Sequence, residues 1–366
     1  MSESVITGRE QNVFVVGHMN PDTDSICSAI AYADLKCKMT GKKYTPKRAG
    51  QLSPETEFVL KHFGVKTPGF ISDVREQVKD MEIRVVPTLS KEMSLKAAWD
   101  VMDKETLSTL PILDEDKCLK GLISVADIAK SYMNVYDSEI LAKAETPYRN
   151  ILEVLEGSMV VGNPDDCVTS GKVLIGAAKP EMMENFVEEG DIVIVGDRYE
   201  AQLCAIEMKA KCVVVCTGAN VAKTITRMAE QRGCAIIQTK YDTFIASRLI
   251  NQSMPIDFFM RKEGLVTFTT EDFLDDIKSV MAEKRHRDFP ILDKEGHYIG
   301  MISRRNLLTV KKKDIILVDH NEVDQAVDGL QSANILEIID HHKIGSLETM
   351  GPVYFRNQPV GCNYTI

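Results

Sequence analysis

Three short apolar runs, each followed at once by Asp and His residues, stand out in the outer parts of the chain. They are residues 13–16 before GHMNPDTDS, residues 315–318 before DHNE, and residues 335–339, interrupted by Glu337, before DHHK. Continuous apolar runs of this length are typical of strands that are covered on both faces of a parallel sheet. The pattern predicts one α/β domain, formed by residues 1–72 and 313–366, that a long insertion interrupts.

The insertion contains an internal repeat. PILD at residues 111–114 recurs at residues 290–293, and seven further identities fall in the same register, at an offset of 179 residues. In each copy the polar and apolar positions predict a strand, an amphipathic helix, two strands and a final helix. We therefore expect two copies of one α+β domain, at residues 73–135 and 256–312.

A third pattern lies between the two copies. Its strand-like apolar runs, at residues 172–175, 192–195, 213–215 and 235–237, alternate with helical stretches. This alternation is typical of a parallel α/β unit. The predicted fold is therefore a parallel-sheet α/β domain interrupted by two α+β domains and, at residues 145–255, one further α/β domain.

Composition narrows the class of protein. The chain has 366 residues, 44% of them hydrophobic and 27% charged, which is typical of a folded protein with several domains. Its net charge of −10 argues against a general binder of nucleic acid or anionic membranes. The nine Cys show no CxxC pair, the start MSESVITGREQ has no apolar signal segment, and no apolar run approaches ~20 residues. We expect a cytoplasmic protein with reduced thiols.

The polar clusters that follow the three apolar runs predict a metal site. In parallel sheets, ligands bind beyond the carboxyl ends of the strands, where these clusters lie. Carboxylate and imidazole groups suit Mn²⁺, Co²⁺, Fe²⁺ or Zn²⁺, and the number of candidates favours two ions over one. Taken alone, an Asp-x-Asp before a helix is a cap and a His pair is a surface feature. The candidates are His18, Asp22, Asp24, Asp319, His320, Asp340, His341 and His342.

These motifs resemble those of a known family. GHMNPDTDS, VDHNE and DHHK are similar to the first three motifs of the DHH phosphoesterases, and among them of the family II, manganese-dependent inorganic pyrophosphatases. The two repeats resemble CBS domains. The segments SGKVLIGA, EEGDIVIVGDR and YDTFIASRLINQS resemble a DRTGG domain. A CBS–DRTGG–CBS insertion is the arrangement of the nucleotide-regulated subfamily, and the resemblance covers essentially the whole chain.

The resemblance implies a role for each candidate. His18 and Asp22 would bind one metal, Asp24 and His341 the other, and Asp319 both. His342 would face the substrate phosphate as a catalytic residue, with Asp340 and His320 orienting the site. The implied cofactors are two Mn²⁺ or Co²⁺ ions, with Mg²⁺ accompanying the substrate pyrophosphate, which is hydrolysed to two phosphates.

The repeats carry a second set of candidates. Ser124 and Asp127 in the first copy correspond to Ser303 and Asn306 in the second, and Arg304 adds positive charge there. Such pairs at a strand-to-helix turn either bind the ribose or phosphate of a nucleotide or only cap the helix. The family implies regulation by AMP, ADP and ATP, with diadenosine polyphosphates as further candidates, and a homodimer.

One departure from the family pattern affects the expected activity. Members continue into a C-terminal DHHA2 domain that closes over the substrate, whereas this sequence ends at GCNYTI. We therefore expect weak or absent pyrophosphatase activity from these 366 residues alone. Two alternatives stay open, namely a DHH-family phosphodiesterase acting on oligonucleotides or cyclic dinucleotides, and a nucleotide sensor without catalysis. The basic stretch 36–48 is predicted to be a solvated loop.

Overall fold

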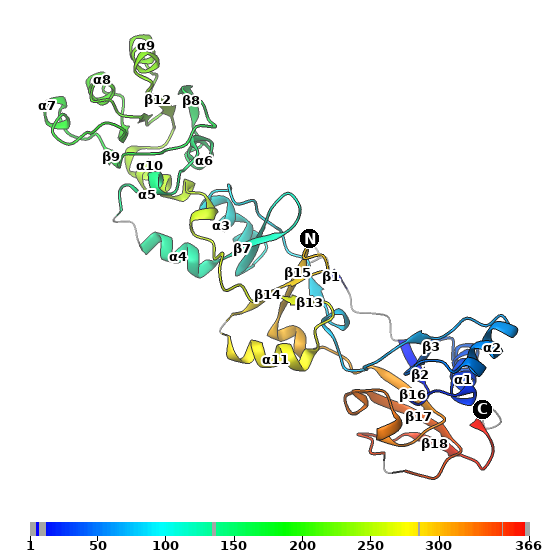
Figure 1. Cartoon of the computed structure of the whole chain (residues 1–366). Coiled ribbons are helices and arrows are strands. Elements are labelled where there is room, and N and C mark those ends of the chain that lie inside the picture. The colour runs from blue at the N-terminus through cyan, green and yellow to red at the C-terminus, as the bar shows by residue number, and fades with distance from the viewer. Residues whose placement is uncertain (1–4, 7–11, 134–136, 285, 346, 363–366) are drawn as a thin grey trace. The chain divides into compact units, whose positions relative to one another are not determined.

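The computed structural model describes residues 5–6, 12–133, 137–284, 286–345 and 347–362 (Figure 1). The chain divides into two compact units. The first comprises residues 1–85, 267–295 and 299–366, and the second comprises residues 86–266 and 296–298.

The first unit contains a six-stranded sheet in which all neighbouring strands are parallel. Its order is β18-β17-β16-β2-β3-β4. The chain forms the half ending in β4 first and the half ending in β18 after the insertion, so the order reverses between β2 and β16. The strands are β2 (Asn12–Val16), β3 (Lys43–Arg48), β4 (Gly69–Phe70), β16 (Asp314–Val318), β17 (Asn334–Asp340) and β18 (Tyr354–Asn357).

The apolar runs explain how this sheet is buried. Alternate residues of β2 and β16 enter different cores, with Val15 and Ile316 on the side of helix α1 (Thr23–Thr40) and Val16 and Leu317 on the other. A strand covered on both faces needs apolar residues at successive positions. Helix α1 begins after the N-cap Asp22 and ends at Gly41, whose left-handed φ of 68° favours glycine. Helix α2 (Pro54–His62) follows β3.

The prediction that residues 36–48 form a solvated loop is wrong. Residues 36–40 end α1, and Lys43–Arg48 forms β3, which pairs in parallel with β2 over its first five residues. Its side chains are mostly half-buried, and the Thr45 hydroxyl donates a hydrogen bond of 2.8 Å to Asn12 Oδ1. Main-chain pairing to a buried neighbour makes this segment a strand although its side chains are polar.

The repeat is confirmed for the amphipathic helix and the two strands after it, whereas the leading strand is present at Phe268–Thr269 in the second copy and only as an isolated bridge at Leu89 in the first. Helix α3 (Leu95–Lys104) and strands β6 (Thr109–Leu113) and β7 (Leu119–Ser124) of the second unit recur, 179 residues later, as α11 (Leu274–Glu283), β14 (Asp288–Leu292) and β15 (Tyr298–Ser303). In the first unit β14 and β15 belong to a sheet of order β1-β5-β15-β14-β13. Its remaining strands are β1 (Val5–Ile6), β5 (Ile83–Arg84) and β13 (Phe268–Thr269).

The two copies differ at their ends. The first ends in the α-helix α4 (Val125–Met133), whereas the second has only the five-residue 3₁₀ helix η4 (Arg304–Leu308). The prediction of a final helix thus holds fully for the first copy alone. In the second copy the chain must enter β16 at Asp314, and the β-branched Thr309 and Val310 disfavour a longer helix.

The second unit also contains a five-stranded sheet of order β8-β12-β11-β10-β9. The four predicted strands are confirmed as β9 (Val173–Ile175), β10 (Ile192–Val195), β11 (Cys212–Val215) and β12 (Ala235–Gln238), all parallel. Strand β8 (Ser158–Val161), antiparallel at one edge, was not predicted. The helices are α5 (Ile140–Lys143), α6 (Tyr148–Val154), α7 (Pro180–Met183), α8 (Tyr199–Glu207), α9 (Lys223–Arg232) and α10 (Thr243–Leu249).

Shorter 3₁₀ helices complete the structure, namely η1 (Val78–Asp80), η2 (Ile250–Ser253), η3 (Ile256–Phe258), η5 (Val323–Gln325) and η6 (Leu330–Ser332). All nine Cys lie among the described residues, and each is a free thiol, as predicted. Within the described part of the chain, no helix combines the length and apolar character needed to cross a membrane.

Candidate metal centre

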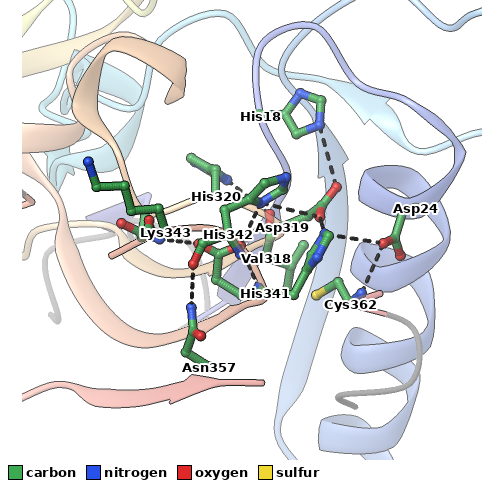
Figure 2. Close-up of polar contacts among 12 residues, drawn as sticks. His18, Asp24, Val318, Asp319, His320, His341, His342, Lys343, Asn357 and Cys362 are labelled. Atoms are coloured by element: carbon green, nitrogen blue, oxygen red, sulfur yellow. Dashed lines mark hydrogen bonds and ion pairs between the residues drawn. The ribbon is translucent and has the colours of Figure 1, made fainter. Parts of the chain in front are cut away.

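The three polar clusters converge at the carboxyl edge of the six-stranded sheet (Figure 2). Asp319, directly after β16, lies at the centre, and its side chain is only 1% exposed. His18, after β2, places Nε2 3.4 Å from Asp319 Oδ2. His341, after β17, places Nε2 3.1 Å from Asp319 Oδ1. Neighbouring parallel strands thus bring together residues that lie more than 300 positions apart.

Asp319 has an unusual backbone conformation. Its φ of 62° lies in the left-handed region, and its N–H donates to Ile339 O at 2.9 Å. Non-glycine residues in this region are uncommon and occur often at functional sites. Its Oδ2 is buried and accepts no hydrogen bond within the described structure. A buried carboxylate oxygen without a donor is costly unless a cation satisfies it, so the residues present fit a bound metal ion.

Two groups of potential ligands share Asp319. His18, Asp22 and Asp319 form one group, and Asp319, His341 and His342 form the other, with ligand atoms within 4.8 Å of one another in each group. Asp24 adjoins the second group, since its Oδ2 lies 3.7 Å from His341 Nε2. The geometry can therefore accommodate two ions with one carboxylate between them.

Asp22 and Asp24 combine two interactions. Asp22 Oδ1 accepts a hydrogen bond of 2.9 Å from Ser25 N and so caps α1, while lying 3.9 Å from His18 Nε2. Asp24, in the first turn, accepts from the Ser28 hydroxyl at 3.1 Å and from Cys362 N at 2.9 Å. Asp22 can therefore cap α1 and also belong to a group of potential metal ligands.

The pKa values of the two histidines that follow β2 and β16 are shifted in opposite directions. The neighbouring Asp319 carboxylate raises the pKa of His18, against an opposing effect of burial. Burial lowers the pKa of His320, whose Nδ1 contacts Val318 O at 2.9 Å. A neutral His320 that donates from Nδ1 to this carbonyl has a fixed ring orientation.

Asp340 organises the DHHK loop. Its Oδ1 accepts from His341 N at 2.7 Å and from His342 N at 3.1 Å, and it lies 2.8 Å from His342 Nδ1. The Asn321 amide donates to Oδ2. Burial acts to raise the pKa of Asp340, but these hydrogen bonds outweigh it and hold the pKa below its ordinary value. Asp340 is therefore a carboxylate that orients the ring of His342, whose side chain is 53% exposed.

Asn321 belongs to this loop but was not among the candidates from the sequence. It is buried, donates to Asp340 and to Lys343 O, and accepts from Gly345 N. The signal available was its position directly after Asp319 and His320. A buried amide there can satisfy both a carboxylate and a turn in the neighbouring loop.

The candidates in the repeats cap helical turns. Asp127 Oδ2 accepts from Ser124 N at 2.9 Å and from its hydroxyl at 2.6 Å, and Asn306 Oδ1 does the same for Ser303, at 2.8 Å in both cases. Arg304 donates to two carbonyl groups, of Met281 and Lys284. The first pair lies in the second unit and the other three residues lie in the first.

Comparisons with known proteins bear on both parts of the chain. Residues 78–134 and 256–313 match the CBS domain model, and residues 150–253 match that of the DRTGG domain. A cobalt-dependent inorganic pyrophosphatase of Clostridium perfringens is 41% identical over 354 residues, which are 97% of this chain. A probable manganese-dependent inorganic pyrophosphatase of Thermotoga maritima is 36% identical over 357 residues, again 97% of this chain. The chain is a homologue of the family II inorganic pyrophosphatases with a CBS–DRTGG–CBS regulatory region.

A solved structure supports the regulatory part. It contains the CBS and DRTGG domains of the regulatory region of the C. perfringens pyrophosphatase with the activator diadenosine tetraphosphate. It is 37% identical to this chain and has a TM-score of 0.60. The match covers 63% of this chain and 100% of the solved chain. The resemblance and the fold class predicted from the sequence are thereby confirmed. The chain spans 64% and 65% of the length of the two pyrophosphatase relatives.

Proposed function

We propose that this protein provides the metal centre of an inorganic pyrophosphatase, which hydrolyses pyrophosphate to two phosphates with two Mn²⁺ or Co²⁺ ions. The observation that carries the proposal is the sharing of Asp319 between two groups of potential ligands. Its buried Oδ2, which accepts no hydrogen bond within the described structure, gives a physical reason for a cation there. The names of the two pyrophosphatase relatives support the same reaction, with either cobalt or manganese.

Each side chain has a distinct part in this proposal. His18 and Asp22 hold one ion, Asp24 and His341 the other, and Asp319 both. Bound divalent ions supply Lewis acidity toward the phosphoryl oxygens and make a water nucleophilic at neutral pH.

The substrate is bound by this chain's own groups as well. His342 is exposed, and Asp340 holds its Nδ1, so the other ring nitrogen is left to contact the substrate phosphate. The N-terminus of α1, an 18-residue helix, adds positive potential beside Asp22 and Asp24. Mg²⁺ accompanies the pyrophosphate and reduces its charge.

Regulation by adenine nucleotides at the CBS domains is the second part of the proposal. The solved relative binds diadenosine tetraphosphate as an activator in the same kind of region. Each CBS copy would contact nucleotide through its own residues, in addition to the hydrogen bonds that they make now: Ser124 and Asp127 in the first, and Ser303, Arg304 and Asn306 in the second. A nucleotide can change the rate only through its different affinities for two arrangements of the protein.

Ion counting and phosphate release test the catalytic part. We expect the 366-residue chain to bind two Mn²⁺ or Co²⁺ per chain in equilibrium dialysis. Phosphate release from magnesium pyrophosphate should occur with Mn²⁺ and with Co²⁺, and should stop when the ions are removed by a chelator. A dinucleotide substrate, assayed in parallel, should yield no product.

Other outcomes separate the alternatives. Cleavage of the dinucleotide in preference to pyrophosphate would replace this reaction by that of a phosphodiesterase. Two bound ions with no phosphate release with either metal, and with nucleotide binding intact, would favour a sensor without catalysis. Absence of bound ions would contradict the proposed centre itself.

A further inference from the structure

The interface between α1 and β17 contains a polar cluster where an apolar contact would be expected. The cluster consists of Tyr32 and Lys36 on α1 and Glu337 on β17. The Tyr32 hydroxyl donates to Glu337 Oε2, and Lys36 Nζ lies 2.5 Å from Oε1. The ion pair is largely buried, with 19% of the Lys36 side chain and 16% of the Glu337 side chain exposed. Glu337 is the residue that interrupts the apolar run of β17.

Glu337 lies at an irregularity of the sheet. Strand β17 pairs Ile335 with Ile315 of β16, but then Glu337 with Ile316, so Leu336 is an extra residue of β17. An extra residue of this kind is a β-bulge. Beyond it the parallel pairing continues regularly, with Ile339 opposite Val318.

The bulge decides which side chains of β17 face α1. Beyond the bulge, Ile339 lies in the same core as Val318 and as Ala33 of α1, whereas Ile338 lies in the core of the opposite face. Because side chains alternate along a strand, a regular strand that kept Leu336 but lacked the bulge would have the two faces exchanged from Glu337 onward. His341, two residues beyond Ile339, would then turn away from α1.

The same two elements carry the ligands of the second ion. Asp24, Tyr32 and Lys36 are separated by multiples of four residues and so share one face of α1. Glu337 lies in β17, and His341 follows directly after the end of this strand, four residues beyond Glu337. One end of this interface thus holds Glu337 with its two partners, and the other holds Asp24 Oδ2 3.7 Å from His341 Nε2.

We propose that Glu337 is a positioning residue: its bonds to Tyr32 and Lys36 hold the bulge of β17 in register with α1 and thereby place His341 beside Asp24 for the second ion. The inference rests on the two-ion centre proposed above. Metal ligands must be held to within ~0.5 Å by the groups behind them, and loss of such support weakens metal binding by ~10–100-fold.

Stability alone does not account for this ion pair. Replacing a buried pair by apolar residues of similar volume is often neutral or stabilising, whereas removing one partner leaves an uncompensated charge. The double variant Lys36→Met/Glu337→Leu therefore removes the polar bonds and should leave the free energy of unfolding at or above that of the wild type. It separates positioning of the ligands from stability of the fold.

The test is a Mn²⁺ titration of the 366-residue chain, with equilibrium dialysis for each ion and electron paramagnetic resonance for the coupling between the two. In the double variant we expect one ion to bind at least ~10-fold more weakly, the other to change less than ~2-fold, and the coupled signal to be lost. Glu337→Gln keeps an acceptor for Tyr32 and should recover part of this affinity. Urea unfolding of the metal-free proteins checks that each variant is folded.

Lys38→Met is the matched control. Lys38 also lies on α1 and also has a carboxylate partner, but that partner is Asp34 of the same helix, and the pair is exposed. We expect this variant to bind both ions as the wild type does. A double variant that binds two coupled ions with unchanged affinities would overturn the positioning role, whereas a wild type that binds no pair of ions would overturn the two-ion centre on which it rests.

Discussion

Asp319 combines three properties that are individually unfavourable in a folded protein. Its backbone is left-handed, its carboxylate is buried, and Oδ2 accepts no hydrogen bond among the described residues. Each costs free energy without a bound cation. In the proposed metal centre, a bound cation would offset the cost of the buried carboxylate.

The substitution Asp319→Asn removes the negative charge of this side chain and keeps its size. Asparagine tolerates the left-handed region as well as aspartate does, so the loop conformation should persist. We expect both ions to be lost in equilibrium dialysis, because both ligand groups include this residue. The metal-free variant should unfold in urea within about 1 kcal/mol of the wild type, since it loses a buried charge together with its contacts to His18 and His341.

Asp324→Asn serves as the control for this prediction, because Asp324 is an exposed residue of the same unit and lies outside both ligand groups. It should retain both ions. Retention of either ion at wild-type affinity in Asp319→Asn would show that Asp319 does not serve both.

At the scale of elements, the pattern of polar and apolar positions predicts strands buried on both faces and amphipathic helices such as α3 and α11, but not strands with polar side chains. Strands β2, β16 and β17 were predicted because each contains an apolar run of four or five residues, interrupted in β17 only by Glu337. Strands β3 and β18, KYTPKR and YFRN, were not, because main-chain pairing and not side-chain burial makes them strands. The interruption by Glu337 is visible in the sequence, but a bulge depends on the partner strand and cannot be inferred from one segment.

The predicted site shows the same limit. Its Asp and His residues follow apolar runs and were named as candidates for that reason, whereas Asn321, which donates to Asp340 of a neighbouring loop, was not. Only the arrangement of β16 next to β17 brings these two residues into contact.

The capping turns of the two repeats should differ in stability. Asn306 caps its turn as Asp127 does, but its amide also donates to Glu82 O, 3.2 Å away, beside β5. We expect Asn306→Ala to lower the free energy of unfolding by about 1–3 kcal/mol, and Asp127→Ala by about 1 kcal/mol. Urea unfolding of the nucleotide-free protein measures both.

Asn306→Asp keeps the acceptor and removes the donor to Glu82, so it should fall between Asn306→Ala and the wild type. Equal losses for Asn306→Ala and Asp127→Ala would contradict the added role of the amide. An AMP titration of the same variants shows whether these side chains also contact the nucleotide.

At the scale of the whole molecule, two buried thiols report on different units. Cys362 lies in the first unit, where its N–H donates to Asp24 Oδ2, and burial raises the pKa of its thiol to about 12. Cys212 lies in β11 of the second unit, and burial raises its pKa well above the ordinary value. Neither thiol is ionised near neutral pH in the folded protein, so alkylation of each requires opening of its surroundings.

Metal binding should protect these two thiols unequally. An ion at ~100 times its dissociation constant stabilises the part of the protein that binds it by about 2.7 kcal/mol, and openings that break the site become ~100-fold rarer. Since the Cys362 N–H donates a hydrogen bond to Asp24, we expect Mn²⁺ to slow the alkylation of Cys362 in urea strongly. The alkylation rate of Cys212 should stay nearly unchanged. Mass spectrometry of labelled peptides measures both rates. The Asp319→Asn variant should show no Mn²⁺ effect on either thiol. Equal protection of both thiols in the wild type would contradict this prediction. It would mean that the two units open together, so that an ion bound in the first unit also stabilises the second.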